Sequence, residues 1–282
     1  MLSRFLGRSE LLSVLHYKSF QLRPRLAVFR YFLDLIQGFL SGLALGIYNA
    51  KELQALTNDY YDQSDLYTSP EYNAQGLYSV ELEALAHMST QPESVLVVSC
   101  GAGREIVSFL DRELRVVGLE GNEKLYAAAV KQFVQHTAKL TLVHLPFDEQ
   151  FESDERFDLI VVGWNSYGHI LTRKQRVELL SHLKSLLTKY GQILISYYPS
   201  NRLPRLVRWM SNATMLFFGC FLGRIQERRF LHFYGSNTSP FCSTALSEAL
   251  LQSELREAGL ELLKKAASYP VFLLGDTLCQ RK

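Results

Sequence analysis

Short apolar runs alternate with helical stretches along the chain from residue 94 onward. The runs are rich in valine, leucine and isoleucine, and we interpret five of them as strands: 95–98, 115–119, 140–143, 159–162 and 192–195. Most of them are separated by stretches with helical spacing, at 103–112, 122–137 and 172–188. Strands that alternate with helices form βαβ units. The pattern therefore predicts an α/β fold with a doubly wound, mainly parallel sheet that has helices on both of its faces.

The C-terminal part is expected to add two strands to this sheet. A helix at 244–258 ends in Ala258-Gly259, which is typical of a helix terminus. Strands follow near 260–266 and 270–279, so we expect a seven-stranded sheet. The segment 199–232, between the fifth strand and this helix, is apolar and rich in arginine. It fits no strand, and we interpret it as an insertion.

The N-terminal part has a different pattern. Apolar side chains recur at helical spacing, which predicts three helices at about 9–20, 26–48 and 49–60. The segment 58–75 is polar and rich in tyrosine, which is typical of a loop, and a helix is expected at 76–90. We therefore expect two domains: a helical N-terminal cap over 1–75, and an α/β domain over 76–282 that carries the insertion 199–232.

The stretch 31–48 is almost wholly apolar and contains three glycines spaced four residues apart, Gly38, Gly42 and Gly46. Glycine costs a helix about 1 kcal/mol relative to alanine, so this spacing predicts close packing against another helix. A membrane span needs about 20 apolar residues, slightly more than this stretch offers. A buried helix or a helix on a membrane surface is therefore favoured over a membrane span.

The overall composition is that of a folded protein, with 282 residues, 48% hydrophobic and 21% charged. The net charge of +2 gives no general sign of a nucleic-acid partner. The charge is uneven, however: 1–30 and 201–229 are basic, whereas 51–83 is acidic. These segments are either solvated faces that pair with one another, or the acidic one faces a cationic ligand.

The cysteines favour a reducing compartment. Cys100, Cys220, Cys242 and Cys279 are scattered, with no CxxC or Cys/His spacing. The sequence therefore predicts neither a disulfide framework nor a metal site. The N-terminus lacks the layout of a signal peptide, so we expect a cytoplasmic protein, with association to a membrane left open.

A glycine turn follows the first predicted strand, and consists of Ser99, Cys100, Gly101, Ala102 and Gly103. Glycines at a strand-to-helix turn let the backbone approach a ligand and direct amide N–H groups at it. A dinucleotide-binding fingerprint would have glycine or alanine where Ile106 stands, which disfavours an NAD enzyme. A tight turn without a ligand is the alternative interpretation of the turn alone.

Glu120 ends the second predicted strand, and Gly121 and Asn122 open the next helix. A carboxylate at this place can accept hydrogen bonds from both hydroxyls of a ribose. The alternative is a glutamate exposed to water at a strand end. Because the turn and the carboxylate follow adjacent strands, together they favour a ligand that contains a nucleoside.

At these residues the chain resembles the class I S-adenosylmethionine (SAM)-dependent methyltransferases, which have a Rossmann-like fold. The segments similar to the motifs of that family are 95–105, 116–122, 145–148, 157–162 and 187–196. The chain departs from the family pattern at Tyr190, where a glycine is usual, and at His144, where an acidic residue is usual. The resemblance covers 94–198 well and 244–279 loosely.

The resemblance implies that SAM is the cofactor. The turn residues Ser99, Cys100, Gly101 and Gly103 would hold it, together with Glu120, Gly121 and Asn122. The resemblance also implies an adenine contact from Phe147 or Asp148.

The segment Gly163-Trp164-Asn165-Ser166-Tyr167-Gly168-His169 is similar to one in small-molecule N-methyltransferases of the glycine and sarcosine type. This likeness implies that Gly163, Trp164 and Asn165 border the cofactor, with Trp164 and Asn165 beside the sulfonium and the acceptor. An aromatic face attracts a sulfonium cation, and tryptophan is the best such face. His169 could take a proton from the acceptor as the catalytic base. It could instead cap the next helix or pack beneath the loop.

Tyr60 and Tyr61 precede the sheet, as the cap tyrosines of methyltransferases often do. Tyr61 is therefore a candidate to fold over the methionyl end of SAM. The alternative is an ordinary aromatic anchor. The apolar elements 31–48 and 206–223 are predicted to form a lid over the crevice, because such pockets are mostly apolar.

The favoured function is transfer of a methyl group from SAM to nitrogen or oxygen of a small-molecule or lipid-like acceptor. One alternative is a non-catalytic partner subunit that binds SAM or a nucleoside. Another is an RNA or DNA methyltransferase, whose candidate contacts are Arg202, Arg205, Arg208, Arg224, Arg228 and Arg229. The apolar residues between these arginines make a membrane surface or a lipidic acceptor a competing explanation, so a peripheral membrane contact is left open and we expect no nucleic-acid partner. Oligomerisation is left open.

Overall fold

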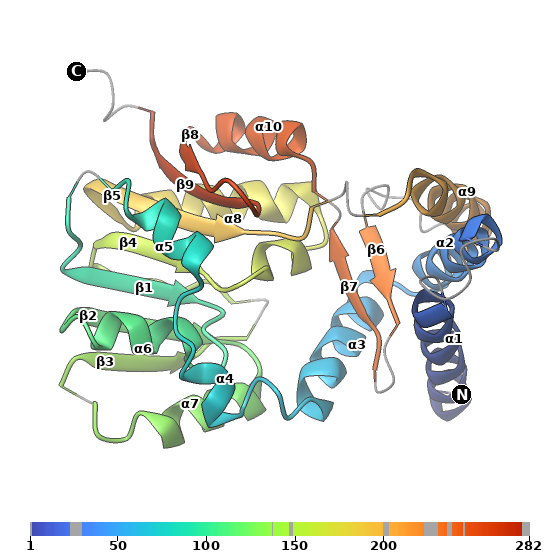
Figure 1. Cartoon of the computed structure of the whole chain (residues 1–282), viewed down its shortest axis with the longest axis horizontal. Helices are drawn as coiled ribbons and strands as arrows, with labels where there is room; N and C mark the ends of the chain where they lie inside the picture. Colours follow the sequence, from blue (N-terminus) through green and yellow to red (C-terminus); the bar gives the residue numbers. More distant parts are fainter. Residues whose placement is uncertain are drawn as a thin grey trace. The chain divides into compact units, whose positions relative to one another are not determined.

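The computed structural model describes residues 2–22, 30–88, 90–136, 138–146, 149–199, 203–222, 231–235, 239–244 and 246–277 (Figure 1). The chain forms two compact units. The one we call the helical unit consists of Met1–Gln63, Gly168–Thr172 and Pro199–Ser247. The one we call the sheet unit consists of Ser64–Tyr167, Arg173–Tyr198 and Glu248–Lys282. Compactness does not test independent folding, so the two domains expected from the sequence stay a prediction.

The described part of the sheet unit contains one sheet of seven strands. The strands are β1 (Ser94–Val98), β2 (Arg115–Glu120), β3 (Leu140–His144), β4 (Phe157–Val162), β5 (Leu187–Ser196), β8 (Leu260–Lys265) and β9 (Val271–Asp276). Their order is β3-β2-β1-β4-β5-β9-β8. The first five are parallel, whereas β9 runs antiparallel to β5 and β8. The predicted seven-stranded, mainly parallel sheet is confirmed.

Helices cover both faces of this sheet, as expected (Figure 1). The helices are α4 (Pro70–Asn73), α5 (Ser79–Leu85), α6 (Arg104–Leu110), α7 (Glu123–Gln132), α8 (Arg173–Ser185) and α10 (Glu248–Ala258). On one face, α5, α6 and α7 bury Leu85, Phe109 and Ala129 against strand residues such as Val97. On the opposite face α8 packs beside α10. Strands covered on both faces read as continuous apolar runs, which is why the sequence revealed them.

The register of the parallel strands brings their carboxyl ends to one edge of the sheet. Val98, the last residue of β1, pairs with Leu119 in β2 and with Val162 in β4. The residues that follow these three strands therefore gather at the same edge. This is where open α/β sheets bind their ligands.

The helical unit contains four long helices and a hairpin among its described residues. They are α1 (Leu2–Leu22), α2 (Arg30–Ile47), α3 (Ala50–Gln63) and α9 (Arg205–Leu222), with strands β6 (Leu231–Tyr234) and β7 (Phe241–Thr244). The 3-10 turn η2 (Ser166–His169) contains one of the two points at which the chain passes from the sheet unit to the helical unit. A core that includes Leu45, Leu53, Met215 and Phe233 joins α2, α3, α9 and the hairpin.

The three regularly spaced glycines of α2 face α9. A Cβ atom added to Gly42 would lie 2.3 Å from the backbone oxygen of Ser211, and one added to Gly46 would lie 2.8 Å from Cβ of Phe218. Gly38 similarly lies against Val207 and Met210. The close packing of 31–48 against another helix is confirmed. The predicted lid over the crevice stays a prediction.

Two local expectations were wrong. The segment 58–75 was expected to be a loop, but α3 extends to Gln63 and Ser69 caps α4, with its hydroxyl accepting from the amide of Tyr72 at 3.1 Å. The insertion 199–232 was expected to contain no strand, but β6 begins at Leu231. Three of the four residues of β6 are buried in succession, so the strand lacks the apolar–polar alternation that would have revealed it.

No single helix among the described residues is long and apolar enough to cross a membrane. Helices α2 and α3 reach the required length and hydropathy only as a pair, and they are bent by 119° at the break between them.

Candidate functional site

The turn after β1 has a backbone that only glycine fits at one position. Three of its residues have positive φ: Ser99 (55°), Gly101 (58°) and Gly103 (107°). A Cβ atom on Gly103 would lie 2.1 Å from Cε2 of Phe133, so a side chain there would displace the α7 end. A Cβ atom on Gly101 would meet nothing within 4 Å. The turn is thus packed on one side and borders open space on the other.

Glu120 joins this turn to the end of β2. One carboxylate oxygen accepts from the amide of Gly101 and the other from the amide of Asn122, both at 2.7 Å. Burial raises the pKa of Glu120, while hydrogen bonds from the amides of Asn122, Gly101 and Gly121 oppose the rise. A carboxylate has about four acceptor positions, so further donors can still bind it.

The residues after Glu120 begin α7. The side chain of Asn122 accepts from the amide of Leu125 at 2.9 Å and caps the helix. The carbonyl of Gly121 lies 3.2 Å from Nε2 of His144. Asn122 therefore uses its side-chain oxygen within the helix terminus, and Gly121 links the ends of β2 and β3.

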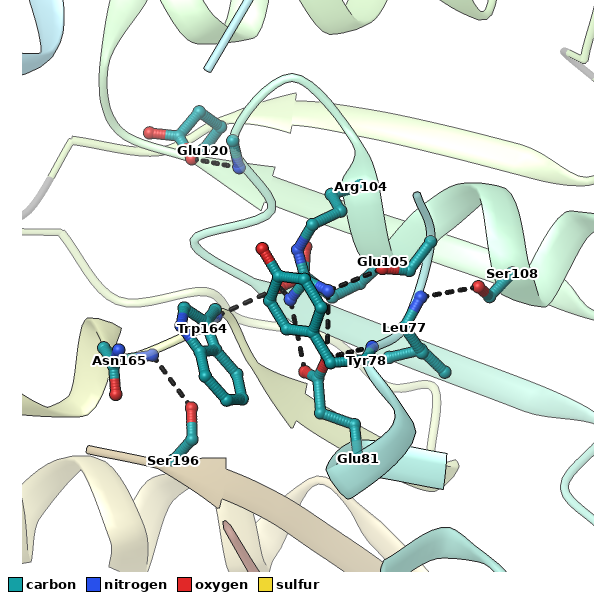
Figure 2. Close-up of polar contacts among 12 residues, drawn as sticks. Leu77, Tyr78, Glu81, Arg104, Glu105, Ser108, Glu120, Trp164, Asn165 and Ser196 are labelled. Carbon is teal, nitrogen blue, oxygen red and sulfur yellow. Dashed lines mark hydrogen bonds and ion pairs between the residues drawn. The ribbon is translucent and has the colours of Figure 1, made fainter. Parts of the chain in front are cut away.

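The loop after β4 packs directly on the turn. A Cβ atom on Gly163 would lie 2.2 Å from the carbonyl oxygen of Ser99, and the Gly163 amide donates to Val98 at 2.8 Å. Asn165 has φ 61°, and its amide donates to the hydroxyl of Ser196 at 2.8 Å (Figure 2). The structure therefore brings the loops after β1, β2 and β4 together, as the register requires.

Trp164 lies in an aromatic group. Its ring stacks on Tyr269 with centroids 4.8 Å apart and meets Tyr78 edge-on at the same distance. The hydroxyl of Tyr269 donates to Oδ1 of Asn165 at 3.0 Å. One face of the Trp164 ring is thus covered by Tyr269, and the role expected for Trp164 beside the sulfonium stays a prediction.

A buried ionic cluster lies at the start of α6, directly after the turn, and it was not predicted from the sequence. Arg104 donates to Glu81 at 2.9 Å, to Glu105 at 2.6 Å and to the carbonyl of Gly76 at 2.6 Å (Figure 2). Its guanidinium also lies 4.1 Å from the ring centre of Tyr78. All three charged side chains are at most 4% exposed. Buried charges are tolerated when paired in this way.

This cluster positions the loop after β4 as well. Glu105 accepts from Arg104 and, with the same oxygen, from the amide of Trp164 at 3.0 Å (Figure 2). The amide of Leu77 is held by Ser108 in α6 at 2.8 Å. The segment before α5, the start of α6 and the loop after β4 are therefore one connected structure.

The helical unit contains the two remaining candidates, and it brings them together. The hydroxyl of Tyr61 lies 3.1 Å from Nε2 of His169, and Nδ1 of His169 lies 3.0 Å from the carbonyl of Cys242. A carbonyl only accepts, so Nδ1 carries the proton and Nε2 accepts from Tyr61. Burial lowers the pKa of His169, and the bond to Cys242 opposes this. The imidazole is therefore neutral at neutral pH.

Other expected residues contribute less to this geometry or lie outside the described residues. Cys100 is buried, and burial raises the pKa of its thiol, which disfavours a reactive thiolate. Phe147 and Asp148 lie outside the described residues. So do four of the six arginines proposed as nucleic-acid contacts, Arg202, Arg224, Arg228 and Arg229.

The sheet unit thus has the features of a Rossmann-like cofactor-binding fold: a glycine turn after β1, a buried carboxylate after β2, and a shared edge. Residues 95–191 match the family model of a methyltransferase domain. Family match and fold together identify a class I SAM-dependent methyltransferase, and SAM is its methyl donor.

Solved structures share this fold at low sequence identity. The CcbJ methyltransferase from Streptomyces caelestis is 16% identical with a TM-score of 0.58, over 78% of this chain and 98% of that one. A SAM-dependent methyltransferase from Clostridium acetobutylicum is 12% identical with a TM-score of 0.52, over 77% and 94%. The glycopeptide N-methyltransferase MtfA in complex with SAM is 17% identical with a TM-score of 0.51, over 77% and 88%. No curated protein matches the chain.

Proposed function

We propose that this enzyme transfers the methyl group of SAM to nitrogen or oxygen of a small-molecule or lipid-like acceptor. The observation that carries the proposal is the pair Tyr61–His169, which offers a neutral base with a defined tautomer. The fold similarity to a glycopeptide N-methyltransferase is compatible with an acceptor that is not a nucleic acid.

The residues at the strand ends fit the cofactor. The turn residues Ser99, Cys100, Gly101 and Gly103 would hold SAM through their backbone, since the turn borders open space at Gly101. Glu120 would accept from the ribose, because bonds from the amides of Gly101, Asn122 and Gly121 leave about one acceptor position on its carboxylate.

The remaining cofactor contacts follow from the family resemblance. They are Gly121 and Asn122 at the start of α7, Phe147 and Asp148 at the adenine, Tyr61 at the methionyl end, and Gly163, Trp164 and Asn165 in the loop after β4. When bound, SAM supplies a methyl group on a positively charged sulfur, which a lone pair of the acceptor attacks.

The protein's chemical task is then to remove one proton from the acceptor. An acceptor O–H or N–H would give its proton to the oxygen of Tyr61 while Tyr61 gives its own to Nε2 of His169. The imidazolium that results keeps its Nδ1–H bond to the carbonyl of Cys242 and later releases the proton to water. The lowered pKa of His169 keeps it ready to accept at neutral pH.

The test is transfer of labelled methyl from SAM to fractions of a cell extract incubated with the purified enzyme. Label in the organic-soluble or small-molecule fraction would support the proposal. Label confined to RNA, DNA or protein would contradict it. Heat-inactivated enzyme provides the background in each fraction.

A further inference from the structure

We infer that helices α1, α2 and α9 of the helical unit form a surface that docks onto a lipid bilayer with anionic headgroups. This docking surface belongs to one unit, and the inference does not depend on the identity of the methyl acceptor. Figure 1 shows the three helices beside one another, and α2 packs against both α1 and α9.

Large apolar side chains point outward along α9. Trp209, Phe217 and Phe221 are 63%, 60% and 79% exposed, and Ala213 between them is exposed as well. Positions four residues apart lie on one side of a helix, so these four form a continuous stripe. A solvated helix would carry polar side chains on this side.

The other two helices of the docking surface, α1 and α2, also expose large apolar side chains. Phe32 and Phe39 of α2 are exposed, and so are Leu11 and Leu15 of α1. Soluble monomers rarely expose contiguous apolar patches of more than a few hundred square ångströms. Aromatic rings on both α2 and α9 therefore indicate an interaction surface.

Several polar side chains of the same helices are buried. The hydroxyl of Ser211 in α9 bonds that of Ser41 in α2 at 3.2 Å, and both residues are at most 2% exposed. Asp34 and Gln37 of α2 are buried too, and Nδ1 of His16 in α1 accepts from the amide of Gly235 at 2.8 Å. Small residues and hydroxyl bonds between helices, with apolar side chains outside, are how helices pack in lipid.

The charges on α2 and α9 favour a lipid surface over a second copy of the chain as the partner of the docking surface. Gly38 lies against Val207 and Met210 while Gly46 lies against Phe218, so α2 and α9 run parallel and begin at the same end. Arg30 of α2 and both Arg205 and Arg208 of α9 lie in the first turns there.

Among the described residues of α2 and α9, the single acid is Asp34, which is buried. A second copy that packed through α2 and α9 would bring the same arginines, and the described residues of these two helices offer no exposed carboxylate to meet them. Attraction to anionic headgroups contributes about 1 kcal/mol of binding free energy for each arginine near the membrane surface.

The contact is with the membrane surface. No single described helix passes the length and hydropathy test for a span. Helices with one apolar side bury that side at the boundary of headgroups and acyl chains.

The test uses the full chain and vesicles of phosphatidylcholine with 30% phosphatidylserine. The chain has two tryptophans, so a Trp164→Phe variant leaves Trp209 as the only reporter. We expect this protein to sediment with the vesicles, with a blue shift of Trp209 fluorescence and quenching by brominated lipid. Phosphatidylcholine alone should bind it at least about 10-fold more weakly, given the three arginines.

The variant Phe217→Glu/Phe221→Glu should reduce vesicle binding at least about 100-fold, because it places charge at the centre of the apolar stripe. The matched control is Val134→Glu/Tyr190→Glu, which changes two exposed apolar residues of the sheet unit and should bind as the parent does. Circular dichroism of both variants checks that each folds.

Two outcomes would overturn the inference. One is a folded parent that fails to bind the anionic vesicles. The other is a dimer, seen by light scattering, that the Phe217→Glu/Phe221→Glu variant dissociates while vesicle binding is absent. Failure of methyl transfer in the extract experiment would leave the vesicle result standing, since that result needs no acceptor.

Discussion

Both units have an apolar core, and they differ in the polar side chains that they bury and in the aromatic side chains that they expose. In the sheet unit, buried charged groups are paired, such as Arg176 with Glu254 at 2.7 Å, or bound by amides, such as Glu120. In the helical unit, α2 and α9 bury serines, Asp34 and Gln37 as well as apolar residues, and they expose phenylalanines and a tryptophan. The sheet unit therefore follows the rule for a protein in water, and the exposed aromatic side chains of α2 and α9 are what the proposed lipid contact would cover.

On this basis we propose different roles for the two units. The sheet unit gathers loops at one edge and holds them with backbone bonds to Glu120 and with the Arg104 cluster. Such a site needs rigidity, because cofactor and acceptor must meet in line. The helical unit contributes a surface and the Tyr61–His169 pair.

Removing Arg104 tests how much the sheet unit depends on its buried charges. The Arg104→Met variant leaves Glu81 and Glu105 buried without their cation, which should lower the free energy of unfolding by about 3–5 kcal/mol. Thermal or urea unfolding measures this. The exposed control Arg115→Met breaks a pair with Glu155 in which both side chains are about half exposed, and should cost less than about 1 kcal/mol. Equal losses would refute a special role for the buried cluster.

Replacing His169 tests the chemistry proposed for the helical unit. His169→Asn should lower kcat about 100-fold, which corresponds to about 2.7 kcal/mol of transition-state stabilisation. In the wild type, kcat should fall as the pH drops and His169 becomes protonated. Because the pKa of His169 is lowered, the midpoint of this fall should lie below 6.5, the usual value for histidine.

In the His169→Asn variant, kcat should not show this fall at low pH. Tyr61→Phe should also lower kcat, whereas Tyr60→Phe, the matched control on the same helix, should change it less. If kcat of the His169→Asn variant falls at low pH as that of the wild type does, His169 is not the base.

The sheet could be predicted from the sequence because its central strands are apolar runs and most of the first five strands alternate with helices. Gly101 and Glu120 were recognisable for a similar reason, since both stand directly after predicted strands. The Arg104 cluster could not be recognised: Glu81 lies 23 residues before its partner, and no local period connects them. The same holds for Tyr61 and His169, which are 108 residues apart and meet only through the fold.

Filling the space at Gly42 tests whether the packing of α2 against α9 depends on close contact. A Cβ atom there would lie 2.3 Å from a backbone oxygen of α9, so Gly42→Val must push the helices apart. We expect a loss of about 2 kcal/mol in the free energy of unfolding. The control Ala213→Val adds the same side chain on the exposed side of α9 and should have little effect. If both variants are equally stable, the glycines do not determine the packing.

The smallest effect is expected at Glu120, where the change is in binding. Glu120→Gln keeps the size of the side chain, removes its charge and turns one acceptor oxygen into an NH2 donor, so one of the bonds from the Gly101 and Asn122 amides is lost and the bond from a ribose weakens. We expect the Kd of SAM to rise about 10-fold, or about 1.4 kcal/mol, by calorimetry. Glu123→Gln, three residues further on and exposed, is the matched control and should bind SAM as the wild type does. Unchanged affinity in Glu120→Gln would show that the carboxylate serves the loop structure alone, and the ribose contact would then have to come from another residue at the same edge.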